Sequence, residues 1–176
     1  MPRPSSSVSI GDEAPNFDLS STENAVLMLK DELARTSVLL YFFASAESDR
    51  VRRDLEALER RREALKGLRG RILGVSPLTV DALRKVQADS RLRFPLLCDD
   101  RNFSASYGVG PIEEGRPADP ALVLVSRKQK ILFVANPVAA VEEALPQVEK
   151  LLKDLPSPTR DYPKSVINRW IDRWVN

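Results

Sequence analysis

The feature that most constrains the fold is an unbroken run of apolar and aromatic residues, Val38-Leu-Leu-Tyr-Phe-Phe43, which follows Ser37. A strand with one face in water alternates polar and apolar residues, whereas a strand covered on both faces does not. Strands of the second kind lie at the centre of parallel or mixed sheets whose faces are covered by helices. The run over 37–43 therefore predicts a central strand of an α/β fold.

The segments after this strand alternate between helical and strand patterns. Apolar residues recur at spacings of four, three and seven between Asp49 and Leu68, which predicts an amphipathic helix. Residues 71–75 are predicted to form a strand, and 79–89 a second helix with Thr79 as its N-cap. This order predicts right-handed crossovers between parallel strands.

The second half of the chain predicts a short strand, a hairpin and a last helix. The strand is expected over 94–97, and the hairpin joins 121–125 to 130–134 through a polar turn. Apolar residues on one helical face predict the last helix over 139–152.

The length of 176 residues suits one domain. We expect this domain over 8–154, after a mobile Pro/Ser-rich tail at 1–7. A Pro-rich break separates it from a C-terminal extension at 155–176.

The C-terminal extension contains both tryptophans of the chain. Its apolar residues recur at helical spacing and predict an amphipathic helix with Ile167, Trp170, Ile171 and Trp174 on one face. Such a face is costly to leave in water, and Trp is common at the centre of protein interfaces. We expect it to bind a protein partner or to fold back onto its own domain.

The composition argues against several classes of function. The chain has no His and only one Cys, so intramolecular disulfides, Cys/His zinc sites and His-dependent nucleophiles are excluded, and no cofactor or metal is expected. Its 27 basic and 25 acidic residues are interspersed, so no nucleic-acid partner is expected. Without a signal peptide or apolar span, we expect a soluble protein of the cytoplasm or another reducing compartment, in contact with a membrane only as a peripheral subunit.

Several short sequence motifs occur in a characteristic order between about residues 8 and 152. They include Ile10-Gly-Asp-Glu-Ala-Pro-Asn-Phe-Asp-Leu19, Val38–Phe43, Leu73-Gly-Val-Ser-Pro77, Phe94-Pro-Leu-Leu-Cys-Asp99, Tyr107-Gly-Val109 and the 121–134 hairpin. In these motifs the chain resembles the AhpC/TSA peroxiredoxins of the thioredoxin superfamily. The resemblance implies a thioredoxin-like three-layer sandwich, with a mixed central sheet and helices on both faces.

The same resemblance implies that the reactive site has been lost. Peroxiredoxins place Pro-x-x-x-Thr/Ser-x-x-Cys at the helix after this central strand, where the helix N-terminus and an Arg lower the thiol pKa. Aligned without gaps, Ala44 stands for the Pro, Ser48 for the Thr/Ser and Val51 for the Cys. Pro120 stands in place of the Arg, and Glu56 in place of the resolving Cys of some relatives. Valine cannot form a thiolate or a sulfenic acid, so no catalytic residue is expected here.

Pro120 also leads directly into an apolar strand, as the cis-proline of thioredoxins does. We therefore expect a cis Asp119–Pro120 bond, although few X–Pro bonds are cis.

Cys98 is a weak candidate for a replacement nucleophile. It lies at the end of a predicted strand, but Asp99 and Asp100 follow it and are expected to raise its pKa. The alternative is a small residue that packs where relatives often have Ser.

Charged residues near the family site also have a structural explanation. Glu47, Asp49 and Asp54 could form a carboxylate or metal cluster, but Asp49 more simply caps the helix. The arginines between Arg50 and Arg62 alternate with acids, which favours a solvated helix face over a phosphate-binding or RNA-binding surface.

Three hypotheses for function follow. The first is a catalytically inactive peroxiredoxin-like protein that acts as an interaction or accessory subunit of a larger assembly, through its extension or as a homo-oligomer. The alternative is a thiol-dependent peroxidase or redox sensor that uses Cys98. A third is a small-molecule binder in the vacated pocket, for which the sequence indicates no ligand.

Overall fold

The central strand is the core of a mixed sheet. In the computed structural model, which describes residues 7–109 and 119–156, every residue of β3 (Ser37–Phe42) is buried. This strand pairs in parallel with β4 (Gly70–Ser76) and antiparallel with β6 (Ala121–Val125). The strand predicted from the apolar run is therefore confirmed, with a neighbour on each side.

The sheet of the described residues has seven strands in the order β2-β1-β5-β4-β3-β6-β7. At one edge, β1 (Asp18–Ser21) and β2 (Val26–Met28) form a hairpin that pairs through β1 with β5 (Leu96–Cys98). At the other edge, β7 (Ile131–Ala135) completes the predicted hairpin with β6. The sequence did not predict the β1–β2 hairpin.

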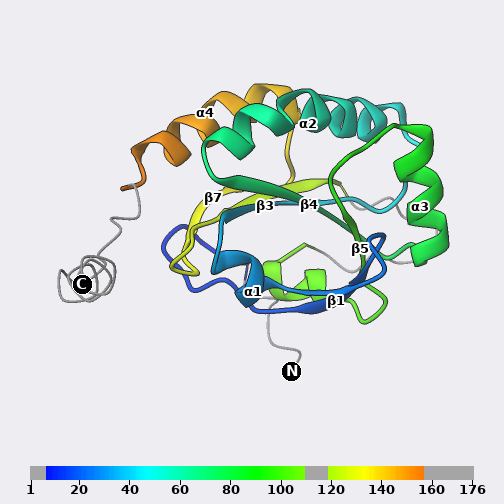
Figure 1. Ribbon diagram of the computed structural model, residues 1–176, viewed down its shortest axis with the longest axis horizontal. Helices are drawn as coiled ribbons and strands as arrows, with labels where there is room; N and C mark the ends of the chain where they lie inside the picture. The colour runs from blue at the N-terminus through cyan, green and yellow to red at the C-terminus, as the bar shows by residue number, and fades with distance from the viewer. Residues whose placement is uncertain (1–6, 110–118, 157–176) are drawn as a thin grey trace, which may run out of the picture.

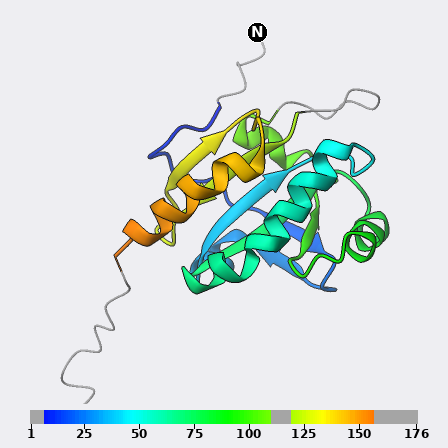
Figure 2. The ribbon, with the colours of Figure 1, turned by 90° about the horizontal axis from the view of Figure 1, so that it is seen from above.

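Helices cover both faces of this sheet, which confirms the three-layer architecture (Figure 1). On one face, α2 (Asp49–Gly67) and α4 (Val141–Asp154) lie side by side, as Figure 2 shows, with α3 (Val80–Asp89) packed against β5. The opposite face is covered by the short helix α1 (Leu29–Leu33) and the 3-10 helix η1 (Phe103–Tyr107). None of the helices in 7–109 and 119–156 is both long and apolar enough to cross a membrane.

Alternate side chains of the β3 segment belong to two apolar clusters, one on each face of the sheet. The residues on the α2–α4 side are Leu39, Tyr41 and Phe43, and those on the α1 side are Val38, Leu40 and Phe42. The period of two that a strand imposes therefore places Tyr41 beneath the first turns of α2.

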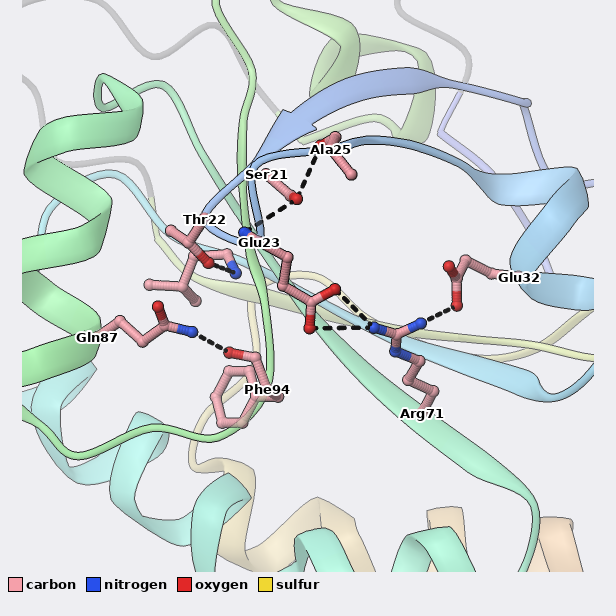
Figure 3. A network of polar contacts seen from close by, with 9 residues as sticks. Ser21, Thr22, Glu23, Ala25, Glu32, Arg71, Gln87 and Phe94 are labelled. Atoms are coloured by element: carbon pink, nitrogen blue, oxygen red, sulfur yellow. Dashed lines mark hydrogen bonds and ion pairs between the residues drawn. The ribbon is translucent and has the colours of Figure 1, made fainter.

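A polar network joins the β1–β2 hairpin and α1 to β4 (Figure 3). Arg71 of β4 donates from Nη1 to Glu32 Oε2 at 2.6 Å and from Nη2 to Glu23 Oε2 at 3.2 Å. The groups are partly exposed, so we assign them only about 0–1 kcal/mol each. Their main effect is to orient the edge hairpin against the sheet.

The N-cap of α3 agrees with the sequence. Thr79 caps α3, its Oγ1 accepting from the N–H of Ala82 at 3.2 Å as predicted.

The predicted extension with Ile167, Trp170, Ile171 and Trp174 lies outside the described residues.

The predicted cis bond is wrong. Asp119–Pro120 is trans, and the cis bond among the described residues is Asn136–Pro137. Pro120 is a buried residue directly before β6, where its missing N–H costs no bond of the ladder. Its carbonyl accepts from the N–H of Val138 at 2.8 Å, so it joins the two loops at this end of the sheet.

Candidate functional site

The family position lies at the end of β3, where the chain enters α2. Val51 is the third residue of α2, and its side chain is 5 % exposed and part of the apolar cluster beneath the helix. Ser48, at the N-cap, has an extended backbone but makes no side-chain capping bond. Ala44 is half-buried in the loop between them and β3. An apolar side chain therefore fills the inner face of the first turn of α2.

A buried carboxylate connects three elements behind Val51. Asp54 Oδ2 accepts from the hydroxyl of Tyr41 at 2.9 Å, and Oδ1 accepts from the N–H of Val141 at 3.2 Å. Asp54 is 5 % exposed and Tyr41 fully buried. These bonds join α2 to β3 and to the N-terminus of α4, where a negative charge is favourable.

The hydroxyl of Tyr41 is held in its neutral, donating form. Burial raises the pKa of Tyr41 well above its ordinary value, and the charge of Asp54 and their hydrogen bond raise it further. Arg50 has a smaller opposing effect on this pKa. Tyr41 therefore acts as a donor to Asp54 and does not supply an ionised oxygen at neutral pH.

A guanidinium lies beside the first turn of α2 even though residue 120 is proline. Arg50 donates from Nη2 to the carbonyl of Val138, and its Nη1 lies 3.8 Å from Asp119 Oδ1. Its Nε is buried and has no partner among the described residues. Arg50 thus connects α2 to the segment before β6 and to the loop before α4. Sequence reasoning assigned Arg50 only to a solvated helix face and missed this position.

The acidic residues near the α2 site do not gather into one cluster. Glu47 and Asp49 are exposed, whereas Asp54 is buried. Asp49 is not the predicted cap: it is the first residue of α2, and its Oδ1 lies 3.7 Å from Arg52 Nη1. Across 7–109 and 119–156 no group of three or more acidic or thiol side chains is placed to hold a metal ion.

Three further arginines of α2 form the predicted ion-paired surface. Pairs along α2 and from α2 to α4 have nitrogen–oxygen distances between 3.2 and 3.7 Å: Arg62 with Glu59, Arg60 with Glu142 and Arg61 with Glu149. These cations are already matched by acids, so they do not form a phosphate-binding surface.

Cys98 lies apart from the α2 site. It is at the end of β5, opposite Ser76 of β4 and Ser20 of β1. Since β4 separates β5 from β3, Cys98 lies two strands from β3, or about 10 Å in the hydrogen-bonding direction. The structure therefore does not bring the thiol to the first turn of α2.

The surroundings of Cys98 disfavour its thiolate. Burial raises its pKa, and the charges of Asp100 and Asp99 raise it further, as the sequence predicted for the two acids. Asp99 accepts from the N–H groups of Phe103 at 2.6 Å and Ser104 at 2.8 Å, so its carboxylate caps η1. A cavity of about 360 Å³ lies beside these acids, and its described lining residues include neither Cys98 nor a cation.

Comparison with known proteins agrees with the architecture. The sequence model of the AhpC/TSA family matches residues 10–134. No curated protein sequence matches significantly.

Several solved structures are similar to this chain. Peroxidoxin BcpB from Mycobacterium tuberculosis has a TM-score of 0.76 at 20 % identity, over 84 % of this chain and 98 % of that one. Peroxiredoxin Q from Xanthomonas campestris has a TM-score of 0.68 at 19 % identity, over 78 % of this chain and 89 % of that one. AhpC from Mycobacterium bovis has a TM-score of 0.69 at 19 % identity, over 88 % of this chain and 98 % of that one. With its fold and its family match in agreement, this chain belongs to the AhpC/TSA family and has a peroxiredoxin-type thioredoxin fold.

Proposed function

We propose that this chain does not perform the peroxide chemistry of its family and acts as an interaction or accessory subunit of a larger assembly. Its family and fold are those of thiol peroxidases. The observation that supports the proposal is Val51, buried in the first turn of α2 where the resemblance places the reactive cysteine.

The chemistry of that turn supports the same proposal. A peroxidatic sulfur must be ionised and accessible to peroxide. Val51 has no ionisable group, and the nearby guanidinium of Arg50 is directed at the Val138 carbonyl and Asp119. The polar groups here contact one another, in an arrangement that ties α2 to β3, to α4 and to the segment before β6.

The alternative is redox chemistry at Cys98. Its half-buried position allows slow oxidation, but its raised pKa leaves little thiolate at neutral pH. Backbone hydrogen bonds at Asp100 and Val80 lower this pKa, but burial and the charges of the two acids have the larger effect, so we rank this alternative second.

The interaction part of the proposal depends on the extension. Ile167, Trp170, Ile171 and Trp174 form its expected apolar face. Assembly with further copies of this chain is the other route.

A turnover assay separates the two candidate functions. Peroxide consumption with a dithiol reductant is measured for the wild type and for Cys98→Ser, which is matched to it in size. We expect the two proteins to consume peroxide at the same rate as the reductant alone. Consumption that disappears in Cys98→Ser would establish the alternative.

A co-purification experiment tests the interaction. The full chain and a Trp170→Ala/Trp174→Ala variant are recovered from the native source under identical conditions. We expect a protein that co-purifies stoichiometrically with the wild type and is lost from the variant, whose far-ultraviolet circular dichroism is unchanged. Recovery of the same proteins with both chains would contradict a role for the tryptophans.

A further inference from the structure

A second site lies at the opposite end of the sheet from Val51. An open groove of about 870 Å³ is formed around Ser37, where β3 begins, by the end of α1, the α2–β4 connection, the β6–β7 turn and the end of α4. Pockets that bind small molecules typically measure about 300–1,000 Å³. The groove is therefore large enough for a small ligand and is separate from the α2 site.

The floor of the groove is apolar. It is lined by five leucines, of which two are buried and three half-buried: Leu33, Leu152, Leu68, Leu132 and Leu155. They come from α1, from α4 and the residue after it, from the residue after α2, and from β7. An alkyl chain laid on this floor would remove apolar surface from water on both sides of the contact.

The rim of the groove is cationic, and none of the described residues that line it is acidic. Five basic side chains line it: Arg69, Arg127, Lys128, Lys130 and Lys153. None of the twelve ion pairs formed among the described residues involves any of these five. Arg127 donates from Nη2 to the carbonyl of Ala34 at 3.1 Å, which holds its guanidinium over the groove. Glu13 is the sheet partner opposite Lys130 but does not line the groove, so the charge of the lining itself is positive, and positive charge around a concave apolar surface attracts anions.

We propose that this groove binds a free single-chain anionic amphiphile of the fatty-acid type. The alkyl chain lies on the leucine floor, and the terminal carboxylate meets the cationic rim. Charge argues against the chain's own tail as the occupant, because residues 157–176 include four basic and two acidic residues and so have the same sign as the rim.

The test uses the full chain and laurate, titrated by calorimetry below the concentration at which laurate forms micelles. We expect saturable binding of laurate with a stoichiometry of one, and weakening when salt is raised from about 0.05 to about 0.5 M. Dodecyltrimethylammonium, with the same chain length and the opposite charge, is expected not to bind.

Charge-reversal variants locate the ligand. Lys153→Glu is expected to weaken laurate binding about three- to tenfold, as expected for loss of a partly exposed ion pair and its replacement by repulsion. The matched control is Lys150→Glu, an exposed residue of the same helix that does not line the groove, with affinity expected to stay within about twofold. Lys128→Glu, on the exposed β6–β7 turn, repeats the test away from α4.

Three results would overturn the proposal: no saturable laurate binding, equal binding of the cationic detergent, or equal weakening by Lys153→Glu and Lys150→Glu. A fourth result, measured on the C-terminal extension, would also overturn it. Both tryptophans lie in the extension, so their emission reports on it alone. If Lys153→Glu shifts this emission without laurate while Lys150→Glu does not, the tail occupies the groove and the proposal is wrong.

Discussion

The hydrogen bond between Tyr41 and Asp54 can be measured against a second buried tyrosine of the same protein. Tyr41 donates to a buried carboxylate, whereas Tyr107 donates from its hydroxyl to the neutral carbonyl of Pro15. Both tyrosines are at most 1 % exposed, so replacing each with Phe removes one oxygen from a comparable depth.

The expected costs differ because the acceptors differ. A hydrogen bond to a charged group contributes about 1.5–3 kcal/mol and a neutral pair about 0.5–1.5 kcal/mol. Asp54 keeps its second bond, from the N–H of Val141, so its carboxylate is not left bare in Tyr41→Phe. We expect Tyr41→Phe to lower the free energy of unfolding by about 2 kcal/mol and Tyr107→Phe by about 1 kcal/mol.

Urea unfolding followed by circular dichroism measures both values, with the m-value as a check that each variant unfolds in the same way. A double-mutant cycle with Asp54→Asn isolates the pair. Equal costs for Tyr41→Phe and Tyr107→Phe, with no coupling in the cycle, would refute the claim that the Asp54 carboxylate anchors α2.

Three further predictions concern the thiol, the family position and two glycines. Burial and two acids raise the pKa of Cys98, so the rate of its alkylation by iodoacetamide should rise with pH and reach half its maximum above the ordinary thiol pKa of about 8.5. Intact mass measures this rate between about pH 7 and pH 10. Val51→Cys should not gain peroxidase activity in the turnover assay, because the guanidinium of Arg50 is already engaged; turnover by this variant above that of the wild type would contradict this. Gly74→Ala should lower the free energy of unfolding by about 1–3 kcal/mol, since its Cβ would meet a Leu96 methyl at 2.5 Å. Gly67→Ala, at the end of α2, should raise the free energy of unfolding by about 0.5–1 kcal/mol, because nothing lies within 4 Å of the added Cβ. The same urea assay measures both.

The main architecture could be predicted because its signals are strong and local. The apolar run over 37–43 has no alternation, and the hairpin around Ser126–Gln129 is short and flanked by apolar strands. The β1–β2 hairpin and α1 were missed because they are only three to five residues long. Elements of that length depend on pairing with β5 and packing on the sheet, which no local pattern displays.

The candidate site could be located from the sequence, but its contacts could not. The order strand, loop, helix placed Val51 in the first turn of α2. The position of Arg50 depends on Asp119 and Val138, which are distant in the sequence, so its charge looked like part of the surface pattern of α2. Pro120 suggested a cis bond because it leads into an apolar strand as the cis-proline of thioredoxins does, whereas the cis bond among the described residues lies in the neighbouring loop at Asn136–Pro137.

The central claim is that this peroxiredoxin fold has no thiol activated toward peroxide. The most direct test compares the rate at which hydrogen peroxide oxidises Cys98 in the folded chain and in the same chain unfolded in urea, both followed by intact mass at neutral pH. Since the fold raises the pKa of this thiol, we predict oxidation no faster in the folded chain than in the unfolded one. Oxidation many times faster in the folded chain would contradict the account and identify Cys98 as a working peroxidatic cysteine.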